Sequence, residues 1–273
     1  MKRIIIIGAS SGLGERIALD FAKYGFHVGI AARREDRLKA IRDRYPERIV
    51  YRTIDVTAPD AVERFETLVD DNNGMDILLY CSGTGFQDPD LDDTTIRRTL
   101  DVNVVGFSRI VAAAYRFFRQ AGNVRKGLIA AITSVAATKG IGIAAAYSSS
   151  KRFQQQFLDS LEQLAYTQQV NVGFSDIRPG FVRTDLLRAD RDYPMILSVD
   201  EAARLIEEAI LRRRRRVTVD SRWAVVNALW RLVPRVIWKR VNLVSLSSQA
   251  AQVNPALPDA TCPVNLIANA KKQ

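Results

Sequence analysis

A tyrosine and a lysine stand four positions apart in the stretch AAAYSSSK, residues 144–151. Residues at this spacing lie on one face of a helix, so the Lys151 ammonium can lie beside the Tyr147 phenol. A free tyrosine has a pKa of about 10, and ionisation near neutral pH requires a decrease of roughly 3 units, which is about 4 kcal/mol. A neighbouring cation lowers the pKa in this way because it stabilises the phenolate. The pair therefore predicts a tyrosine that exchanges protons with a substrate.

A serine follows an apolar segment, thirteen residues before the tyrosine. Residues 127–133 have the composition of a buried strand, and open α/β sheets bind ligands at the carboxyl ends of their strands. The Ser134 hydroxyl could hold a substrate carbonyl there. Hydride addition to a carbonyl leaves an alkoxide that must be protonated, so the residues together predict hydride transfer. Taken singly, each also has a structural interpretation, such as a half-buried tyrosine or a hydroxyl at a strand end.

The first apolar segment, residues 2–7, runs into the glycine-rich turn GASSGLG. Glycines in such a turn let the main chain approach a ligand, and the free N–H groups at the start of the next helix bind a pyrophosphate. A tight turn without a ligand is the alternative, but the place between a strand and a helix favours dinucleotide binding. The predicted contacts are Gly8, Ser10, Ser11, Gly12, Leu13 and Gly14.

Two arginines follow the second apolar segment. A site for NAD usually has an acid about 20 residues after the glycine turn, whereas an arginine there suits the 2′-phosphate of NADP. This chain has Arg33 and Arg34 at that place and no carboxylate at the strand end. We therefore expect NADP, with NAD less favoured; the alternative is that the arginines only begin a solvated helix.

Apolar segments alternate with amphipathic helical patterns along the chain. The expected strands cover residues 2–7, 27–32, 48–54, 76–81, 127–133, 170–177 and 216–220. The expected helices cover residues 12–24, 35–44, 59–71, 92–119, 146–168 and 199–213. This alternation predicts an α/β fold, a Rossmann-type doubly wound sheet of about seven parallel strands with a C-terminal helical appendage. We expect a dinucleotide-binding catalytic domain over 1–220 and a C-terminal extension over 221–273, with an amphipathic segment (222–240) and a polar tail (245–273).

The order and spacing of these motifs resemble the short-chain dehydrogenase/reductase family over about residues 3–215. The resemblance is carried by GASSGLG, Asp55-Val56, NVVG at 103–106, Ser134, YSSSK at 147–151 and PGFVRT at 179–184. It implies a catalytic tetrad of Asn103, Ser134, Tyr147 and Lys151. Tyr147 would be the general acid or base, Ser134 would polarise the substrate oxygen, and Asn103 would position a water of the proton relay. Lys151 would lower the tyrosine pKa and hold the nicotinamide ribose.

The same resemblance implies further cofactor contacts. Asp55 and Val56 would meet the adenine, and Gly83 would line the cofactor cleft. The nicotinamide end would be held by Tyr147, Lys151, Pro179, Gly180, Val182 and Thr184.

Two positions depart from the family pattern. The threonine before the first glycine is Ile7 here, and the family's Asn-Asn-Ala-Gly is replaced by Tyr80-Cys81-Ser82-Gly83. The second change removes an asparagine side chain that steadies the cleft, so we expect an effect on cofactor affinity rather than on the proton chemistry.

Composition excludes several other classes of protein. Apolar runs are far shorter than the roughly 20 residues of a membrane-spanning helix, and the isoleucines near the start are too few for a secretory signal. Cys81 and Cys262 lack metal-type spacing, and no histidine or carboxylate cluster suggests a metal site. The single histidine, His27, has no nucleophile near it in the pattern, which argues against a Ser-His-Asp hydrolase. We expect a cytoplasmic protein without a metal.

Positive charge is concentrated near the C-terminus. The net charge is +10, and residues 212–240 hold ten Lys or Arg against the single acid Asp220. The arginines at 212–216 suit a solvated helix end, and no nucleic-acid partner is expected. Apolar and tryptophan residues between 223 and 238 follow a helical stripe, which Pro234 should interrupt. The stripe suits a subunit interface, and peripheral contact of 212–240 with an anionic membrane is the alternative.

The segment 185–199 lies where the family carries its substrate lid. Its apolar residues are Leu186, Leu187, Tyr193, Met195, Ile196 and Leu197, which indicate a small to medium hydrophobic carbonyl or alcohol substrate. A loop packed on the core is the alternative. The predicted function is an NADP-dependent oxidoreductase, and the resemblance implies a homodimer or homotetramer. An NADPH-binding regulator without turnover and a membrane-surface protein stay open.

Overall fold

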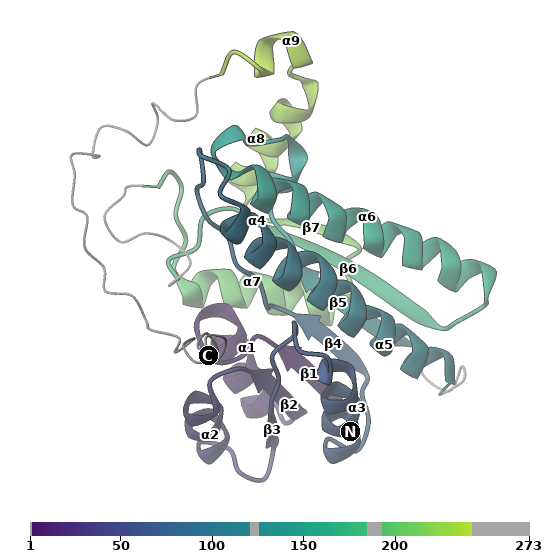
Figure 1. The fold of residues 1–273 in the computed structure, drawn as a ribbon. Helices are drawn as coiled ribbons and strands as arrows, with labels where there is room; N and C mark the ends of the chain where they lie inside the picture. Colours follow the sequence, from purple (N-terminus) through teal and green to yellow (C-terminus); the bar gives the residue numbers. More distant parts are fainter. Residues whose placement is uncertain (1, 121–125, 185–192, 242–273) are drawn as a thin grey trace, which may run out of the picture.

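The computed structural model describes residues 2–120, 126–184 and 193–241 and contains a seven-stranded parallel sheet flanked by helices (Figure 1). The strands lie in the order β3-β2-β1-β4-β5-β6-β7. Their bounds are β1 Arg3–Ile7, β2 His27–Ala32, β3 Ile49–Thr53, β4 Ile77–Tyr80, β5 Gly127–Ile132, β6 Val172–Pro179 and β7 Arg216–Val219. The order reverses between β1 and β4, which confirms the predicted Rossmann-type doubly wound fold.

Strand β1 shows why this sheet lies at the centre of the molecule. Its four consecutive isoleucines are at most 1% exposed, and successive side chains of a strand point to opposite faces. Ile4 and Ile6 belong to one hydrophobic cluster, whereas Ile5 and Ile7 belong to the other. Parallel strands covered on both faces need such continuous apolar runs.

Helices cover both faces of the sheet (Figure 1). One cluster of buried residues joins the sheet to α1 (Gly12–Lys23), α2 (Glu35–Asp43) and α7 (Val199–Leu211). The other joins it to α3 (Ala61–Asp71), α5 (Phe107–Gln120) and α6 (Ala145–Thr167). These elements match the predicted helices except in one region.

The helix expected over residues 92–119 is divided by a wider turn. Helix α4 spans Asp93–Leu100, a π-helical turn spans Asp101–Gly106, and α5 follows. Gly106 permits a close approach there, because an added Cβ would come within 2.7 Å of the Val56 side chain. π-Helical turns within α-helices are frequent at functional sites, and this one buries Asn103 completely.

Beyond β7 the chain continues into α8 (Ser221–Leu232) and the short helix α9 (Arg235–Trp238). Pro234 directly precedes α9 and separates the two helices, as predicted. Trp223 of α8 is buried, and its indole Nε1 donates a hydrogen bond to the Met195 carbonyl at 3.3 Å. Within the described ranges, no helix has both the length and the apolar character needed to cross a bilayer. The polar tail 245–273 and Cys262 lie outside those ranges.

Candidate active site

The residues expected to carry the chemistry gather at the carboxyl edge of the sheet. The glycine turn follows β1, Gly83 follows β4, Ser134 follows β5, and Pro179 ends β6. Because β1, β4, β5 and β6 are parallel neighbours, their carboxyl ends meet at one edge. The first turns of α6 bring Tyr147 and Lys151 to the same edge.

Tyr147 is half-buried, and its hydroxyl interacts with the Ser134 side chain. Burial raises the pKa of Tyr147, and the interaction with Ser134 lowers the pKa by less. The net direction is therefore upward, and the predicted lowering of the Tyr147 pKa is wrong for this arrangement. A neutral phenol is the form that can donate a proton to a substrate oxygen.

Lys151 lies beside Tyr147, with its Nζ 5.9 Å from the centre of the phenol ring. Its ammonium is buried and donates to the Ile132 carbonyl at 3.0 Å and to the Gln154 side-chain oxygen at 3.1 Å. Burial lowers the pKa of Lys151 to about 8, and the negative charge of Asp176 opposes that decrease. Because the ammonium bonds to neutral oxygens rather than to the phenol, burial decides the pKa of Tyr147.

Asn103 anchors the loop that follows β4. Its side-chain oxygen accepts from the Thr84 N–H at 2.9 Å, and its side-chain nitrogen donates to the Thr84 carbonyl at 2.7 Å and to the Ser150 hydroxyl at 3.0 Å. The main-chain carbonyl of Asn103 accepts from the Gln154 side-chain nitrogen at 2.9 Å. The side-chain amide of Gln154 therefore links Lys151 to Asn103, where the family resemblance implies a water.

The glycine turn has backbone conformations and close approaches that only glycine allows. Gly8 has a φ of +91°, and a Cβ there would come within 2.6 Å of the Ser82 nitrogen. Gly12 has a φ of +58° and directly follows Ser11, the N-cap of α1. The first N–H groups of a helix lack partners within the helix, so they suit an anion at this turn. Gly14 packs against the Gly8 carbonyl too closely for any side chain.

Arg34 lies against this turn, and Arg33 does not. The Arg34 guanidinium donates to the Ser10 hydroxyl at 3.0 Å and to the Ser11 hydroxyl at 2.8 Å. Arg33 is exposed. Leu13, also expected at the cofactor, packs its side chain against the hydrophobic core, so only its main chain can face the turn.

The predicted adenine contacts follow β3 at the same edge. The Asp55 carboxylate accepts from the Thr57 N–H at 2.9 Å and from its hydroxyl at 2.8 Å, and Val56 is buried beside Gly106. Gly83 follows β4, and a Cβ there would come within 3.3 Å of the Lys151 ammonium. Glycine at this position therefore leaves room for the lysine.

The loop after β6 closes the other side of the site. Gly180 is packed against the Trp223 ring, which leaves no space for a side chain. Val182 is buried and pairs with Leu197 in an isolated parallel bridge. The Thr184 methyl lies 3.2 Å from where a Cβ on Gly12 would stand, so the loops after β1 and β6 meet.

The apolar segment expected at the substrate is described only in part. Leu186 and Leu187 lie outside the described residues. The ring of Tyr193 packs on Phe181 with centroids 4.8 Å apart, and Phe181 in turn contacts Trp223 at 5.5 Å. These three aromatic rings form a continuous apolar wall.

Two glutamines and one tryptophan at this site are not predicted from the sequence. Gln154 and Gln155 are buried on α6, three and four residues after Lys151, and Trp223 packs on the Gly180 turn. The available sequence signal was the run of three glutamines on a helix with an apolar face. At least one of them must point into the core, and a buried polar side chain needs hydrogen-bond partners there. Nothing in the local sequence of Trp223 indicates its partner.

Candidate metal ligands do not cluster in the parts of the chain that the structure describes. No group of three or more His, Cys, Asp or Glu side chains is close enough there to hold an ion.

Comparison with known proteins supports the family resemblance. The family model described as short chain dehydrogenase matches residues 2–194. An "uncharacterized oxidoreductase" of Myxococcus xanthus is 30% identical over 245 residues, which cover 87% of this chain and 94% of that protein. The 11-beta-hydroxysteroid dehydrogenase A of Sesamum indicum is 27% identical over 273 residues, which cover 90% of this chain and 76% of that protein.

Solved structures share the fold. A short chain dehydrogenase from Burkholderia cenocepacia J2315, in complex with NADP, superposes with a TM-score of 0.74 at 20% identity. The match covers 88% of this chain and 98% of the Burkholderia chain. With the family model spanning most of the sequence, the chain belongs to the short-chain dehydrogenase/reductase family of oxidoreductases.

Proposed function

We propose that this oxidoreductase uses NADP to interconvert a ketone or aldehyde and an alcohol. The observation that carries the proposal is the interaction of the Tyr147 and Ser134 side chains, beside the buried ammonium of Lys151. It provides a proton donor and a second hydroxyl at one point, next to a glycine turn that suits a dinucleotide.

The side chains would act on the substrate oxygen. When bound, the nicotinamide supplies a hydride to the carbonyl carbon or accepts one from the alcohol carbon. Ser134 donates a hydrogen bond to the substrate oxygen and polarises the C–O bond. Tyr147 is protonated at neutral pH and transfers its proton to that oxygen as negative charge develops there. The Lys151 ammonium stabilises the phenolate that is left, since Coulomb attraction is strong in a buried site. Oxidation of an alcohol reverses these proton transfers.

The preference for NADP is supported by Arg34. Its guanidinium lies on the Ser10 and Ser11 hydroxyls, at the turn that would hold the cofactor phosphates. A guanidinium forms strong charge-assisted bonds with phosphate, so Arg34 is the proposed partner of the 2′-phosphate. Arg33, exposed beside it, would add positive charge without a direct contact.

The proposed substrate is a hydrophobic carbonyl compound. Phe181 and Tyr193 are half-buried and pack on the buried Trp223, so these two rings offer apolar surface beside the loop that follows β6. The hydroxysteroid named for the sesame relative is a substrate of this hydrophobic class. An apolar wall with a few placed polar groups is the usual form of a small-molecule site.

A screen of carbonyls and alcohols with NADPH and NADH tests reaction, cofactor and substrate class together. We expect NADPH-dependent reduction of apolar ketones or aldehydes, with slower or no turnover with NADH. Binding of NADPH without oxidation across the whole panel would contradict the proposal and favour a cofactor-sensing regulator.

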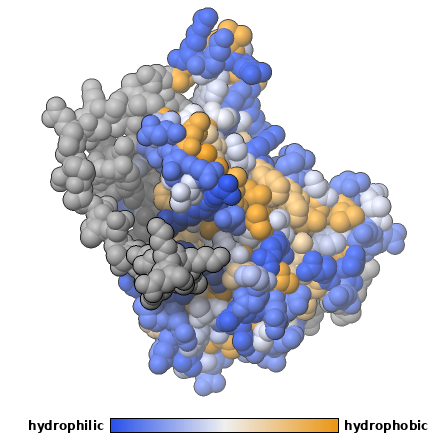
Figure 2. All heavy atoms as spheres, viewed as in Figure 1, coloured by the Kyte–Doolittle hydropathy of each residue, from blue (hydrophilic) through white to orange (hydrophobic). Residues whose placement is uncertain are grey.

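The helices after β7 support a proposed contact surface. Leu229 and Leu232 of α8 and Ile237 of α9 are exposed, and Figure 2 shows apolar residues on α9 and a larger apolar area along α6. We propose residues 1–220 as the catalytic unit, with the extension from 221 onward contributing to a homo-oligomer. Light scattering measures the oligomer, and flotation with anionic vesicles tests the alternative membrane contact.

A further inference from the structure

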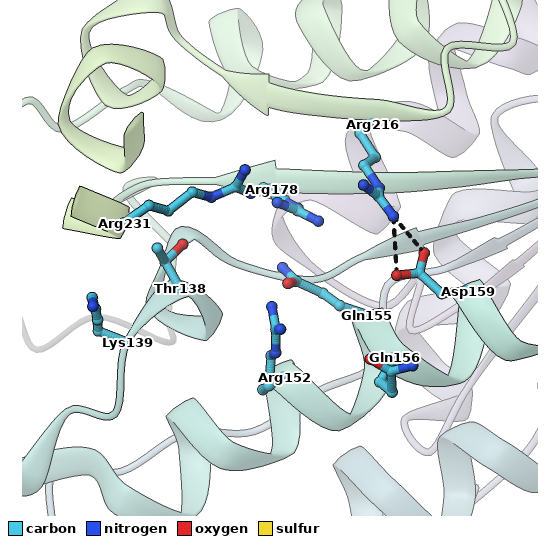
Figure 3. A pocket seen from close by; sticks show the side chains of 9 residues that line it. All are labelled: Thr138, Lys139, Arg152, Gln155, Gln156, Asp159, Arg178, Arg216 and Arg231. Atoms are coloured by element: carbon cyan, nitrogen blue, oxygen red, sulfur yellow. Dashed lines mark hydrogen bonds and ion pairs between the residues drawn. The ribbon is translucent and has the colours of Figure 1, made fainter. Parts of the chain in front are cut away.

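A pocket of about 320 Å³ lies next to the candidate active site, between α6, β6, β7, α8 and the 3-10 helix η3 (Val135–Thr138) (Figure 3). Arg178 and Arg231 enter it from β6 and α8, and Arg152 and Gln155 rise toward them from α6 (Figure 3). Four arginines and Lys139 line the pocket against a single acid, Asp159. Its lining therefore carries a strong excess of positive charge.

Two of these guanidinium groups lack a counter-charge. Arg216 donates to both oxygens of Asp159 at 3.0 Å, and Arg178 bonds to the buried Asp176 at 2.5 and 2.8 Å. Arg152 and Arg231 form no hydrogen bond or ion pair with any other residue that the structure describes. Like charges facing one space repel each other, and a bound anion removes that repulsion.

A buried acceptor faces the same pocket. Gln155 is 2% exposed, and its side-chain nitrogen donates to the Thr133 hydroxyl at 3.3 Å and to the Ser134 carbonyl at 3.2 Å. These bonds fix which end of the amide is the oxygen. That oxygen has no hydrogen-bond partner among the described residues. Because buried polar atoms are nearly always bonded, the amide oxygen marks a position for a ligand donor.

We propose that this pocket binds a small phosphate ester that carries a hydroxyl group, such as a polyol phosphate. The phosphate oxygens would accept paired hydrogen bonds from Arg152 and Arg231, a geometry that guanidinium groups favour. The ligand hydroxyl would donate to the Gln155 oxygen. The volume lies near the lower end of the roughly 300–1,000 Å³ of small-ligand sites, which suits a compact ester. The proposal does not depend on the proposed oxidoreductase activity.

Calorimetric titration of the full chain with glycerol 3-phosphate tests the site. We expect binding at one site per chain, weakened at least about tenfold by Arg152→Gln or Arg231→Gln. Arg204→Gln is the matched control, because Arg204 is an exposed arginine on α7, away from the pocket lining. Arg34→Ala should leave this binding unchanged, which separates the pocket from the proposed cofactor turn. Propyl phosphate, which lacks the free hydroxyl groups, should bind more weakly.

Phosphate esters with hydroxyl groups also occur as lipid headgroups. Binding to vesicles distinguishes such a lipid from a free phosphate ester. Binding to vesicles containing phosphatidylinositol phosphate, but not to phosphatidylserine vesicles of equal charge, would identify a lipid source if the arginine variants abolish it. Absence of binding to both glycerol 3-phosphate and these vesicles would overturn the proposal. Full affinity in the Arg152→Gln/Arg231→Gln double variant would also overturn it, and equal affinity for propyl phosphate would overturn the assignment of a hydroxylated ester.

Discussion

Lys151 donates a hydrogen bond from its buried ammonium to the side-chain oxygen of Gln154, 3.1 Å away on the same helix. The other end of that amide donates to the Asn103 carbonyl, so Gln154 holds the lysine at a fixed place beside Tyr147. We infer that Gln154 is a positioning residue that acts through Lys151.

Replacement of Gln154 should move the pH dependence of the reaction. The Lys151 pKa is already lowered to about 8 by burial, and Gln154→Leu removes an acceptor that stabilises the charged form. The alkaline limb of kcat/KM should therefore shift to lower pH, whereas Gln154→Glu adds a negative charge and should shift it to higher pH. Rates measured between about pH 6 and pH 10 decide this prediction.

Gln156→Leu is the control, because Gln156 is exposed and takes no part in the hydrogen bonds that join Lys151, Gln154 and Asn103. Its profile should match that of the unmodified chain. Identical profiles for all three variants would show that Gln154 does not act through the lysine.

Cofactor preference should depend on Arg34 more than on Arg33. Arg34 lies on the Ser10 and Ser11 hydroxyls. Loss of a charge-assisted hydrogen bond to phosphate lowers binding affinity by about tenfold or more. Arg34→Ala should weaken NADPH binding relative to NADH by that factor, and Arg33→Ala should have a smaller effect. Fluorescence titration with both cofactors measures the ratio, and an unchanged ratio in Arg34→Ala counts against the 2′-phosphate assignment.

Much of the fold follows from local sequence pattern. The isoleucines of β1 predict a strand buried on both faces, and all seven strands lie within two residues of the expected bounds. Pro234 predicts the break between α8 and α9. In these cases the signal is the hydrophobic period or the backbone chemistry of a single residue, neither of which depends on distant partners.

Other features depend on contacts that the sequence does not show. The π-helical turn accompanies the pairing of Asn103 with Thr84, nineteen residues earlier in the chain. The direction of the Tyr147 pKa shift depends on its burial and on Lys151 bonding elsewhere, which outweigh the effect expected from helical spacing. The packing of Trp223 on Gly180 joins segments whose residue types do not predict a contact.

A buried carboxyl between α1 and α7 should make stability depend on pH. Burial raises the pKa of Glu207 from 4.5 to about 7, and the nearby Asp20 adds to the rise. Because the folded chain binds this proton more tightly than the unfolded chain, stability is fully present at low pH and falls as pH rises from 4.5 through about 7. Glu207→Gln removes that loss, on the order of 2 kcal/mol.

Thermal denaturation at several pH values measures this effect. The melting temperature of Glu207→Gln should exceed that of the unmodified chain by a few degrees above pH 7, and the difference should disappear toward about pH 4. Glu66→Gln, an exposed change on α3, should produce no such trend. A difference that is constant with pH would exclude Glu207 as its source.

The docking of α8 should depend on Trp223. Its buried ring fills the space beside Gly180, and truncation of a buried tryptophan costs about 3–5 kcal/mol. Trp223→Ala should therefore lower the free energy of unfolding by roughly that amount, whereas Leu229→Ala, 58% exposed on the same helix, should change it by less than about 0.5 kcal/mol. Equal effects of the two changes in denaturant titrations would show that α8 is not held by the tryptophan.

The most direct test of the proton-transfer account is Tyr147→Phe, assayed with the best substrate of the screen. This change removes the hydroxyl that interacts with Ser134 and leaves the ring in place. We expect kcat to fall by about 10²–10⁴-fold while the Kd for NADPH changes by less than about twofold. Turnover within a few-fold of the unmodified chain, with NADPH still bound, would contradict the assignment of Tyr147 as the proton donor.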